Sequence, residues 1–269
     1  MSQPDIHETA VIKPGAQIAD GVTIGPFCVV GSHVSIGEGS VLFSHVSLVG
    51  NTTIGSNNKI YQNAVIGTWP QDISFSDEDT RVELGDNNVI REFVTVHRGT
   101  HKGDRITRVG NDNYLMAYVH VAHDCEIGNG VILANGVQLG GHVKLEDKVN
   151  VGGLAAFHHF VTVGRLAFVG GLTRVVRDAP PFMTVEGNPS RVRCVNVVGC
   201  NRSGMSSETI SDLRDAYRIL YRQQIPVGDA VAELEKRKSG PEISELVDFF
   251  RKSASGKQGR AREALRKQK

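Results

Sequence analysis

The sequence predicts a parallel β-helix built from hexapeptide repeats, followed by a small α-helical domain. Three observations support this fold class. A large apolar residue, nearly always a branched aliphatic, recurs at every sixth position through most of the chain between Ile6 and Val175. The composition is rich in glycine, with 30 residues, and poor in aromatic residues, at 6%. Near the C-terminal end the six-residue pattern gives way to segments with helical periodicity.

The six-residue period falls into three blocks. The first runs through Ile6, Ile12, Ile18, Ile24, Val30, Ile36, Leu42, Leu48, Ile54, Ile60 and Ile66, and it resumes at Leu84, Ile90 and Val96. The third restarts one residue out of phase at Val109, Leu115, Val121, Ile127, Leu133, Leu139, Leu145, Val151, Phe157, Val163, Val169 and Val175. A period of six fits neither a 3.6-residue helix nor an alternating strand. It is typical of a β-helix in which three hexads form a triangular coil of about eighteen residues, with the aliphatic side chain inside.

Glycine often follows the aliphatic residue, at Gly25, Gly31, Gly37, Gly55 and Gly67. Glycine adopts positive φ without steric cost, so we expect these residues to sit in turns with that conformation. Each buried aliphatic contributes about 1.5–3 kcal/mol. Stacked triangular coils form a prism, and its core therefore needs no aromatic residues.

Two segments interrupt the repeat and are expected to leave the coil as loops, near 68–81 and 97–108. The first contains the only tryptophan, Trp69, and the second carries His97 and Lys102. Insertions in repeat proteins gather on one face, often the binding face. We expect these loops to be functional; tolerated surface loops are the alternative.

The chain is expected to divide into a β-helix, 1–189, and a helical C-terminal domain, 190–269. Ser206, Pro226 and Pro241 mark the starts of three helices with apolar residues at helical spacing. Such a domain covers the end of the prism, which a repeat protein must protect.

The chain ends in a basic tail. From Arg251 it carries eight Lys and Arg residues against one acid, Glu263. We expect a solvated extension, with contact to an acidic carrier protein as the alternative.

The overall composition argues against several classes of protein. Lys plus Arg, at 30, nearly balance Asp plus Glu, at 29, so nucleic-acid binding has no support. No apolar run approaches the roughly 20 residues of a membrane helix, and the amino terminus lacks a signal-peptide pattern. The four cysteines lack metal-site spacing and suit a reducing compartment. We expect a cytoplasmic protein without an integral membrane segment.

Six histidines lie close together in the repeat, namely His97, His120, His123, His142, His158 and His159. Adding one coil of about eighteen residues to His123 reaches Gly141, next to His142, and a further coil reaches His159. Neighbouring strands lie about 4.8 Å apart, and no histidine occupies an inward aliphatic position. We expect the histidines to stack along one outer edge of the prism.

Two chemistries fit these histidines. Asp124 follows His123, and a carboxylate can orient an imidazole and stabilise its protonated form, as a general base requires. Three imidazoles that converge between subunits could instead bind zinc and leave a position open for water, as in the γ-class carbonic anhydrases. The spacing leaves both open.

Several short segments, in fixed order, carry a resemblance to a known family. They are IGPFC at 24–28, QD at 71–72, RE at 91–92, VHRGT at 96–100, HVAHDC at 120–125, ILAN at 132–135, GHV at 141–143, GN at 187–188 and AYR at 216–218. With both loops and the helical cap, the chain resembles the acyl-carrier-protein–UDP-N-acetylglucosamine O-acyltransferases through about residue 250. The resemblance implies an all-β left-handed parallel β-helix of hexapeptide repeats, assembled as a homotrimer.

The resemblance also implies the reaction, the first step of lipid A biosynthesis. A (3-hydroxy)fatty acyl group would pass from acyl carrier protein to the 3-hydroxyl of UDP-N-acetylglucosamine, without a cofactor or a metal. His123 would accept the proton of the sugar hydroxyl, Asp124 would orient His123, and the backbone N–H of Gly141 would stabilise the oxyanion.

The resemblance assigns further residues to substrate binding. Gln71, Asp72, His97, His120, His142 and His159 would line the substrates between subunits, and Asn196 and Arg202 match positions that contact the nucleotide. Gly171 matches the position that limits the acyl groove. Because Gly171 has no side chain, a longer chain has room, although Phe168 nearby could shorten it.

The sequence departs from the family pattern at four positions. Ser74 stands where the family usually has a lysine that contacts phosphate, and His159 replaces a glutamine. Ser203 replaces a second arginine, and Val198 replaces an acidic residue. These departures leave the His–Asp pair intact and alter nucleotide recognition.

Other functions remain open at this point. One is a related nucleotide-sugar acyltransferase or acetyltransferase with a different donor or acceptor. A zinc hydratase of the carbonic anhydrase type is another, and a purely structural repeat protein is a third. Acyl chain length and the choice between the standard sugar and an amino variant do not follow from the sequence.

Overall fold

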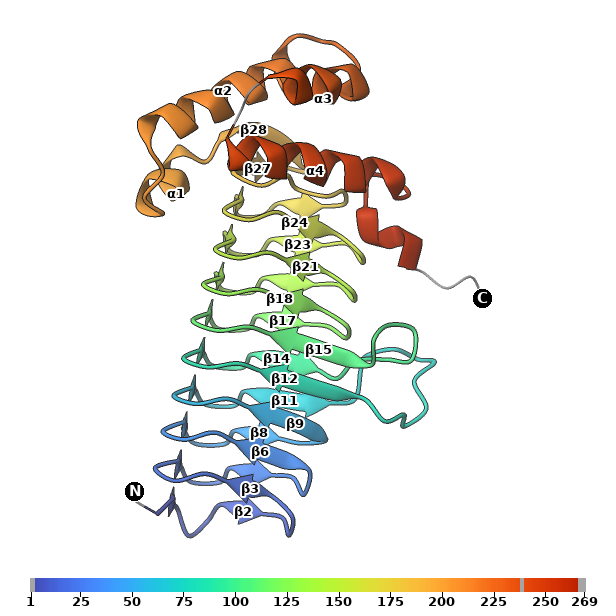
Figure 1. Ribbon diagram of the computed structural model, residues 1–269. Helices are drawn as coiled ribbons and strands as arrows, with labels where there is room; N and C mark the ends of the chain where they lie inside the picture. Colours follow the sequence, from blue (N-terminus) through green and yellow to red (C-terminus); the bar gives the residue numbers. More distant parts are fainter. Residues whose placement is uncertain (1–2, 238–239, 266–269) are drawn as a thin grey trace.

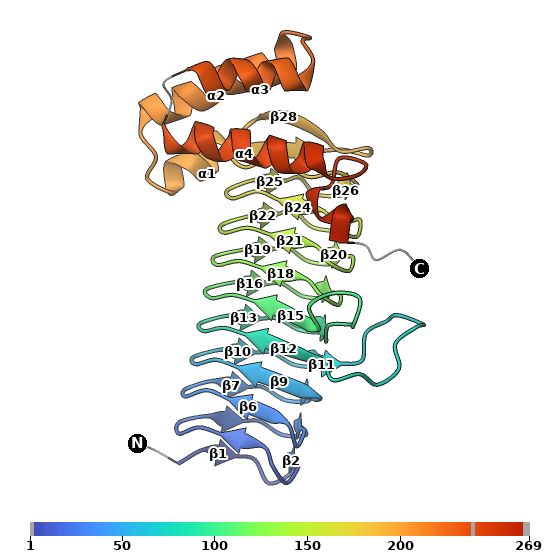
Figure 2. The same ribbon diagram turned by 45° about the vertical axis from the view of Figure 1, so that its right-hand side comes forward.

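The computed structural model describes residues 3–237 and 240–265. It shows a column of stacked coils with helices at the C-terminal end (Figures 1 and 2). Each regular coil contributes one short strand to each of three sheets, which we call sheets A, B and C in chain order. The sheets are parallel throughout, apart from the last pair of strands in sheet A. The predicted fold class, a left-handed parallel β-helix with a small helical C-terminal part, is confirmed.

Sheet A has eleven strands in the described residues. They are β1 (Asp5–Ile6), β4 (Thr23–Ile24), β7 (Val41–Leu42), β10 (Lys59–Ile60), β13 (Val89–Ile90), β16 (Tyr114–Leu115), β19 (Ile132–Leu133), β22 (Asn150–Val151), β25 (Phe168–Val169), β27 (Met183–Glu186) and β28 (Arg191–Val195).

Sheets B and C complete the prism. Sheet B contains β2 (Val11–Ile12), β5 (Val29–Val30), β8 (Ser47–Leu48), β11 (Val65–Thr68), β14 (Thr95–His97), β17 (His120–Val121), β20 (Gln138–Leu139), β23 (Ala156–Phe157) and β26 (Arg174–Val175). Sheet C contains β3 (Gln17–Ile18), β6 (Val34–Ile36), β9 (Asn51–Ile54), β12 (Arg81–Leu84), β15 (Ile106–Val109), β18 (Glu126–Ile127), β21 (Lys144–Leu145) and β24 (Thr162–Val163).

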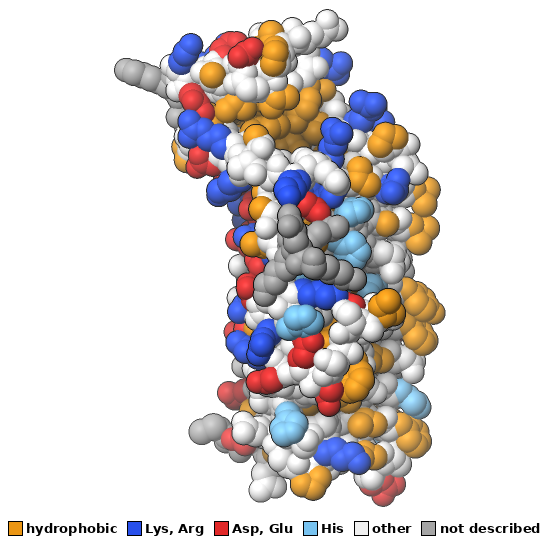
Figure 3. All heavy atoms as spheres, turned by 90° about the vertical axis from the view of Figure 1, so that its right-hand side faces the viewer, with side chains coloured by type: hydrophobic (Ala, Val, Ile, Leu, Met, Phe, Trp, Pro, Cys, Tyr) orange, Lys and Arg blue, Asp and Glu red, His pale blue; other side chains and the backbone are white. Residues whose placement is uncertain are grey.

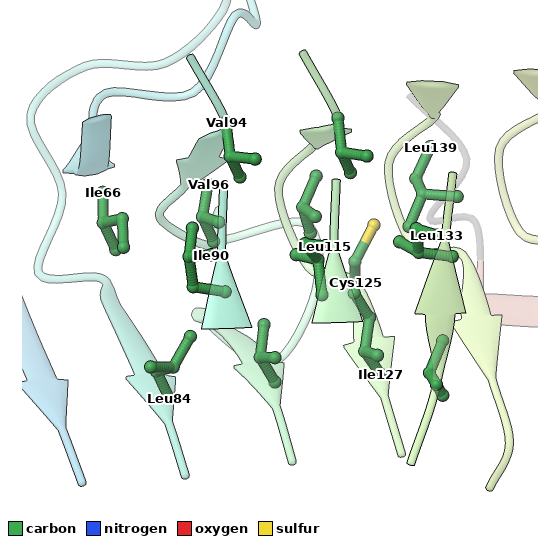
Figure 4. Close-up of a cluster of buried hydrophobic side chains, with 14 of the residues drawn as sticks. Ile66, Leu84, Ile90, Val94, Val96, Leu115, Cys125, Ile127, Leu133 and Leu139 are labelled. Atoms are coloured by element: carbon green, nitrogen blue, oxygen red, sulfur yellow. The ribbon is translucent and has the colours of Figure 1, made fainter. Parts of the chain in front are cut away.

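The predicted aliphatic positions form the core of the prism. Ile90, Leu115 and Leu133 are fully buried, and Figure 4 shows such side chains pointing inward from all three sheets. At the N-terminal end Ile6 stays 40% exposed, because no coil lies beneath the first one. The six-residue pattern therefore reports burial correctly wherever a coil has neighbours on both sides.

The role expected for the glycines that follow the aliphatic residue is wrong at most positions. Only Gly67 among them has positive φ. The positive-φ positions of the turns are held largely by other residues, including Asp124 and His142. Glycine is needed for a different reason: a Cβ on Gly37 would lie 2.6 Å from the backbone carbon of Gly55 in the next coil. Close stacking of the coils excludes a side chain there.

The C-terminal part closes the prism. After β27, which pairs in parallel with β25, the chain turns and β28 pairs antiparallel with β27. The expected boundary after residue 189 falls in this turn, between two strands of the same sheet. The helices that follow are α1 (Val197–Arg202), α2 (Ser207–Arg222), α3 (Val227–Lys236), α4 (Pro241–Ser255) and the 3₁₀ helix η1 (Ala261–Leu265).

The helices share a second hydrophobic core with the end of the prism. Leu166, Phe182 and Met183 of the coil side pack against Leu213 and Leu246 of the helices. This packing covers the end of the prism. In the described ranges, 3–237 and 240–265, no helix is both long and apolar enough to cross a membrane.

The basic tail is not a solvated extension over its described length. Arg260 and Glu263 are 4% and 6% exposed and form an ion pair with each other. Arg262 reaches the turn of His142. The expectation is wrong for Arg260 and Arg262, because Glu263 of the tail pairs with the first and the half-buried Glu126 of the prism pairs with the second; residues 266–269 lie outside the described residues.

Candidate active site

Both loops leave the prism at one corner, where the chain passes from sheet B to sheet C. The first loop, 69–80, joins β11 to β12, and the second, 98–105, joins β14 to β15. The next two turns at this corner carry His123 with Asp124, and then Gly141 with His142. In Figure 1 the loops project to the right, and Figure 3 views that side, where histidine side chains are exposed at several heights.

His123 and Asp124 form a hydrogen-bonded pair. The Nδ1 of His123 lies 2.8 Å from Oδ2 of Asp124. The second loop holds the carboxylate, since the backbone N–H and the hydroxyl of Thr100 donate to it at 3.0 and 2.6 Å. The N–H of Asp124 donates to the hydroxyl of Thr107 at 2.8 Å. Because the carboxylate accepts the Nδ1 proton, Nε2 of His123 carries the lone pair that can accept another proton.

Gly141 lies directly against the ring of His123. A Cβ on Gly141 would lie 2.5 Å from Cε1 and 2.7 Å from Nε2 of His123. Within the described residues the backbone N–H of Gly141 donates no hydrogen bond. The edge of the imidazole therefore lies next to a backbone amide that has no hydrogen-bond acceptor among the described residues.

His142 fills the space beside this pair. Its ring stacks on Phe160 at 4.3 Å and lies 3.7 Å, through Nε2, from Oδ2 of Asp124. Burial lowers the pKa of His142 to about 4; Asp124 opposes this change, and the charges of His123, Arg262 and His159 add to it. His142 is therefore a neutral imidazole at pH 7.

His120 lies in the same coil as His123, and His97 lies in the coil before it. Their rings lie 5.1 Å apart, and Nδ1 of His97 donates to the carbonyl of Trp69 at 2.6 Å. Nδ1 of His120 lies 2.8 Å from the hydroxyl of Thr95. Burial lowers the pKa of both rings, that of His120 to about 4, and nearby histidines lower it further. His97, His120, His123 and His142 thus lie together at one corner of the prism, as expected for histidines stacked along one outer edge.

The two loops are tied together by charged contacts. Lys102 donates to Oδ2 of Asp72 at 2.6 Å and also contacts the hydroxyl of Ser74. Burial alone would raise the pKa of Asp72, but hydrogen bonds from Lys102 and Ser74 hold it below its usual range. Glu78 of the first loop also contacts the ring of His101 and accepts a hydrogen bond from its backbone N–H. The ammonium group of Lys102 therefore lies beside Ser74. Ser74 is the position at which the resemblance implies a lysine.

Other predicted site residues lie beside this cluster or apart from it. Gln71 is exposed in the first loop, and His159 is exposed one coil above Gly141. Gly171 lies at the corner between sheets A and B, and a Cβ there would meet the carbonyl of Gly153 at 3.2 Å.

Asn196 and Arg202 lie over sheet A. They line a cavity of about 540 Å³ together with Phe168 and Lys148. The side chain of Asn196 caps α1 through the N–H of Gly199 and also donates to the carbonyl of Leu166. Within one chain this cavity and the histidine cluster lie on different parts of the prism.

Sequence reasoning missed three residues at the site, namely Thr100, Thr107 and Arg262. Thr100 and Thr107 hold Asp124 from the loop and from β15. Both lie in or beside a predicted loop, but their contacts depend on a loop conformation that no periodicity describes. The contact of Arg262 with His142 spans 120 residues and leaves no sequence signal.

A metal could in principle use the same donors. His123, Asp124 and His142 each offer a ligand atom within 4.8 Å of the others. The carboxylate is already engaged by His123 and Thr100. The donors therefore form a hydrogen-bonded pair rather than the three free imidazoles that the zinc interpretation requires.

Comparison with known proteins identifies relatives of the whole chain. A family model described as UDP N-acetylglucosamine O-acyltransferase, domain 2, matches residues 178–259, and a bacterial transferase hexapeptide model with six repeats matches residues 106–141. The acyl-(acyl-carrier-protein)–UDP-N-acetylglucosamine O-acyltransferase of Paraburkholderia phymatum is 45% identical over 256 residues, which cover 93% of this chain and 98% of that protein.

Solved structures agree with this result. The UDP-N-acetylglucosamine acyltransferase of Francisella novicida superimposes with a TM-score of 0.88 and 39% identity, over 91% of this chain and 90% of that one. The corresponding enzyme of Bacteroides fragilis gives a TM-score of 0.89 and 38% identity, over 91% and 96% of the two chains. The chain therefore belongs to the acyl-(acyl-carrier-protein)–UDP-N-acetylglucosamine O-acyltransferase family.

Proposed function

We propose that this acyltransferase moves a (3-hydroxy)fatty acyl group from acyl carrier protein to the 3-hydroxyl of UDP-N-acetylglucosamine. The observation that supports this reaction best is the His123–Asp124 pair, seated against the free amide of Gly141. The names of the relatives supply the donor and the acceptor. Both substrates are water-soluble molecules of the cytoplasm, so we place the enzyme there.

His123 acts as the general base of a direct transfer. The sugar hydroxyl oxygen forms a bond to the thioester carbonyl carbon while its proton passes to Nε2 of His123. The electron pair of the carbonyl moves to oxygen, and the N–H of Gly141 stabilises that oxyanion by about 2.7–4 kcal/mol. When the oxyanion collapses, the C–S bond breaks and the thiolate takes the proton from His123. The products are the ester and free carrier protein, without an acyl-enzyme or a metal.

Neutral histidines and one lysine bind the acceptor. His97, His120 and His142 are uncharged at pH 7, so each ring offers an N–H that donates to a sugar oxygen or a nitrogen that accepts from a sugar hydroxyl. The diphosphate needs a cation, and Lys102 supplies it from the position beside Ser74. Gln71, Asp72 and His159 surround the same corner as further substrate contacts.

A homotrimer completes the site. The cavity of Asn196 and Arg202 lies over sheet A, whereas His123 lies at the corner between sheets B and C. Packing of the prisms side by side about a threefold axis brings the cavity of one subunit to the corner of the next. Asn196 and Arg202 then contact the nucleotide, and Gly171 bounds the acyl groove.

A donor comparison tests this function. The purified protein is incubated with UDP-N-acetylglucosamine and either 3-hydroxyacyl carrier protein of mixed chain length or the matching coenzyme A thioesters. We expect an O-acyl sugar nucleotide with the carrier-protein donor, and its mass gives the chain length. Product formed only from coenzyme A thioesters, or none with this sugar, would contradict the proposal.

A further inference from the structure

We propose that Arg262 is a positioning residue, which holds the turn of Gly141 and His142 in the geometry that the reaction needs. It lies in residues 256–265, which we call the C-terminal strap. This inference rests on the proposed function. Figures 1 and 2 both show the strap on the side of the prism from which the loops project.

The strap is anchored to the prism by residues other than Arg262. Arg260 is 4% exposed and donates to the carbonyl of Val176 and to Glu263, each at 2.7 Å. Asp178 accepts from the N–H of Ala261 at 2.7 Å and donates its own N–H to the carbonyl of Gly259 at 2.8 Å. The strap therefore keeps its place when Arg262 alone is changed.

Arg262 joins this anchored strap to the reaction site. Its Nε donates to the carbonyl of His142 at 3.1 Å, and its Nη2 donates to Glu126 at 2.9 Å. The side chain is 16% exposed, so water screens these bonds only in part. Hydrogen bonds from a charged donor are about twice as strong as those between neutral groups.

The carbonyl of His142 belongs to the turn that shapes the site. The same turn places Gly141 under the ring of His123, and the N–H of His142 donates to the carbonyl of His123 at 3.0 Å. Arg262 is the strap side chain that holds this turn from the outside. Displacement of a reacting group by about 1 Å can cost about 10²-fold in rate.

The charge of Arg262 acts on the same turn. The groups that face His142 are Asp124, His123, His159 and Arg262, and the last three disfavour its protonated form. The guanidinium thus helps to keep His142 neutral while Asp124 pulls in the opposite direction. Positioning and charge both depend on one side chain.

Arg262 lies three residues beyond the segment, 178–259, that the C-terminal family model matches. A different use for a basic side chain here would be docking of the acidic carrier protein. The two uses differ in the kinetic constant that they change.

The test compares Arg262→Gln, Arg262→Lys and the control Lys257→Gln in the full-length protein. Lys257 is an exposed cation of the same strap. For Arg262→Gln we expect kcat to fall at least tenfold, with KM for both substrates within twofold and an unchanged unfolding midpoint. Arg262→Lys keeps the charge and should fall in between, and Lys257→Gln should match the parent.

Two kinetic outcomes would overturn the proposal. One is unchanged kinetics in Arg262→Gln; the other is a higher KM for the acyl carrier protein at unchanged kcat, which identifies a docking residue. Titration of His142 by NMR gives a second readout that does not need turnover. Its pKa should rise in Arg262→Gln, and an unshifted pKa would contradict the inference even if the parent protein lacked the proposed activity.

Discussion

At the residue scale, His123 depends on groups from three different coils. Asp124 fixes its ring, Thr100 fixes Asp124 from the loop of the preceding coil, and Gly141 supplies the surface beneath it from the following coil. Asp124 and His142 both adopt positive φ, with values of 59° and 62°. The same positive-φ turn recurs in other coils, for example at Phe160 and Leu166, so it belongs to the repeat and not to the site alone.

Gly141→Ala tests the contact between Gly141 and His123. A Cβ would lie 2.5 Å from the imidazole, so the ring must move away from the free amide. We expect kcat to fall about 10²-fold, by loss of alignment, with little change in the unfolding midpoint. Steady-state kinetics and thermal unfolding measure both quantities. Activity equal to that of the parent would show that the reaction does not need the close contact between Gly141 and the ring of His123.

The buried histidines predict how stability depends on pH. His120 and His142 have pKa values of about 4, below the ordinary value of 6.5. The unfolded chain therefore binds more protons between these limits, and stability falls as the pH drops from 6.5 to 4. The slope is at most about 1.4 kcal/mol per pH unit for each histidine. Urea unfolding at several pH values measures it.

The control for this prediction is the pair of variants His120→Gln and His142→Gln. Carboxylates also titrate in this range, so only the difference between variant and parent reports the histidines. Each variant should show a shallower dependence on pH than the parent. Equal slopes in the three proteins would remove these two side chains from the explanation.

At the element scale, the two loops act as a pair because both replace the turn from sheet B to sheet C. This placement could be derived from the sequence, since Ile66, Val96 and Val121 occupy the same position in successive coils. The contact between Lys102 and Ser74 could not, because neither loop follows the six-residue period. In regular coils the spacing of two residues along the sequence fixes the distance between them, whereas in the loops it does not.

Two successive substitutions test whether Lys102 binds the diphosphate. Lys102→Met should raise KM for UDP-N-acetylglucosamine about tenfold with little change in kcat, because one charged contact contributes about 1.5–3 kcal/mol. Addition of Ser74→Lys should restore most of the affinity, since the new amine reaches the same space. If Ser74→Lys restores nothing, Lys102 serves only to tie the loops together.

At the scale of the whole molecule, the sequence predicts the prism and its helical cap but not what the last residues do. The aliphatic pattern reports inward side chains, and Ser206, Pro226 and Pro241 stand at the starts of the helices. The composition of the tail is that of a solvated segment. The residues that hold it, Asp178 through the backbone N–H of Ala261 and Glu126 through Arg262, lie far back in the sequence.

Mixed trimers test the proposal that each site is shared. His123→Ala and Arg202→Ala each damage a different half of the site. When both variants are co-expressed, about a quarter of the interfaces combine an intact His123 with an intact Arg202, provided that the subunits assort at random in a cyclic trimer. Activity at low UDP-N-acetylglucosamine should recover toward that fraction. No recovery would place both residues in the site of one subunit.

The central claim is that His123 removes the proton of the acceptor hydroxyl. The most direct measurement is single-turnover acyl transfer by His123→Ala, beside the parent, with UDP-N-acetylglucosamine and 3-hydroxyacyl carrier protein in the same preparation. The account predicts a rate reduced by about 10²–10⁴-fold, in a protein whose oligomeric state and unfolding midpoint match the parent. Transfer at the parental rate by that variant would contradict it.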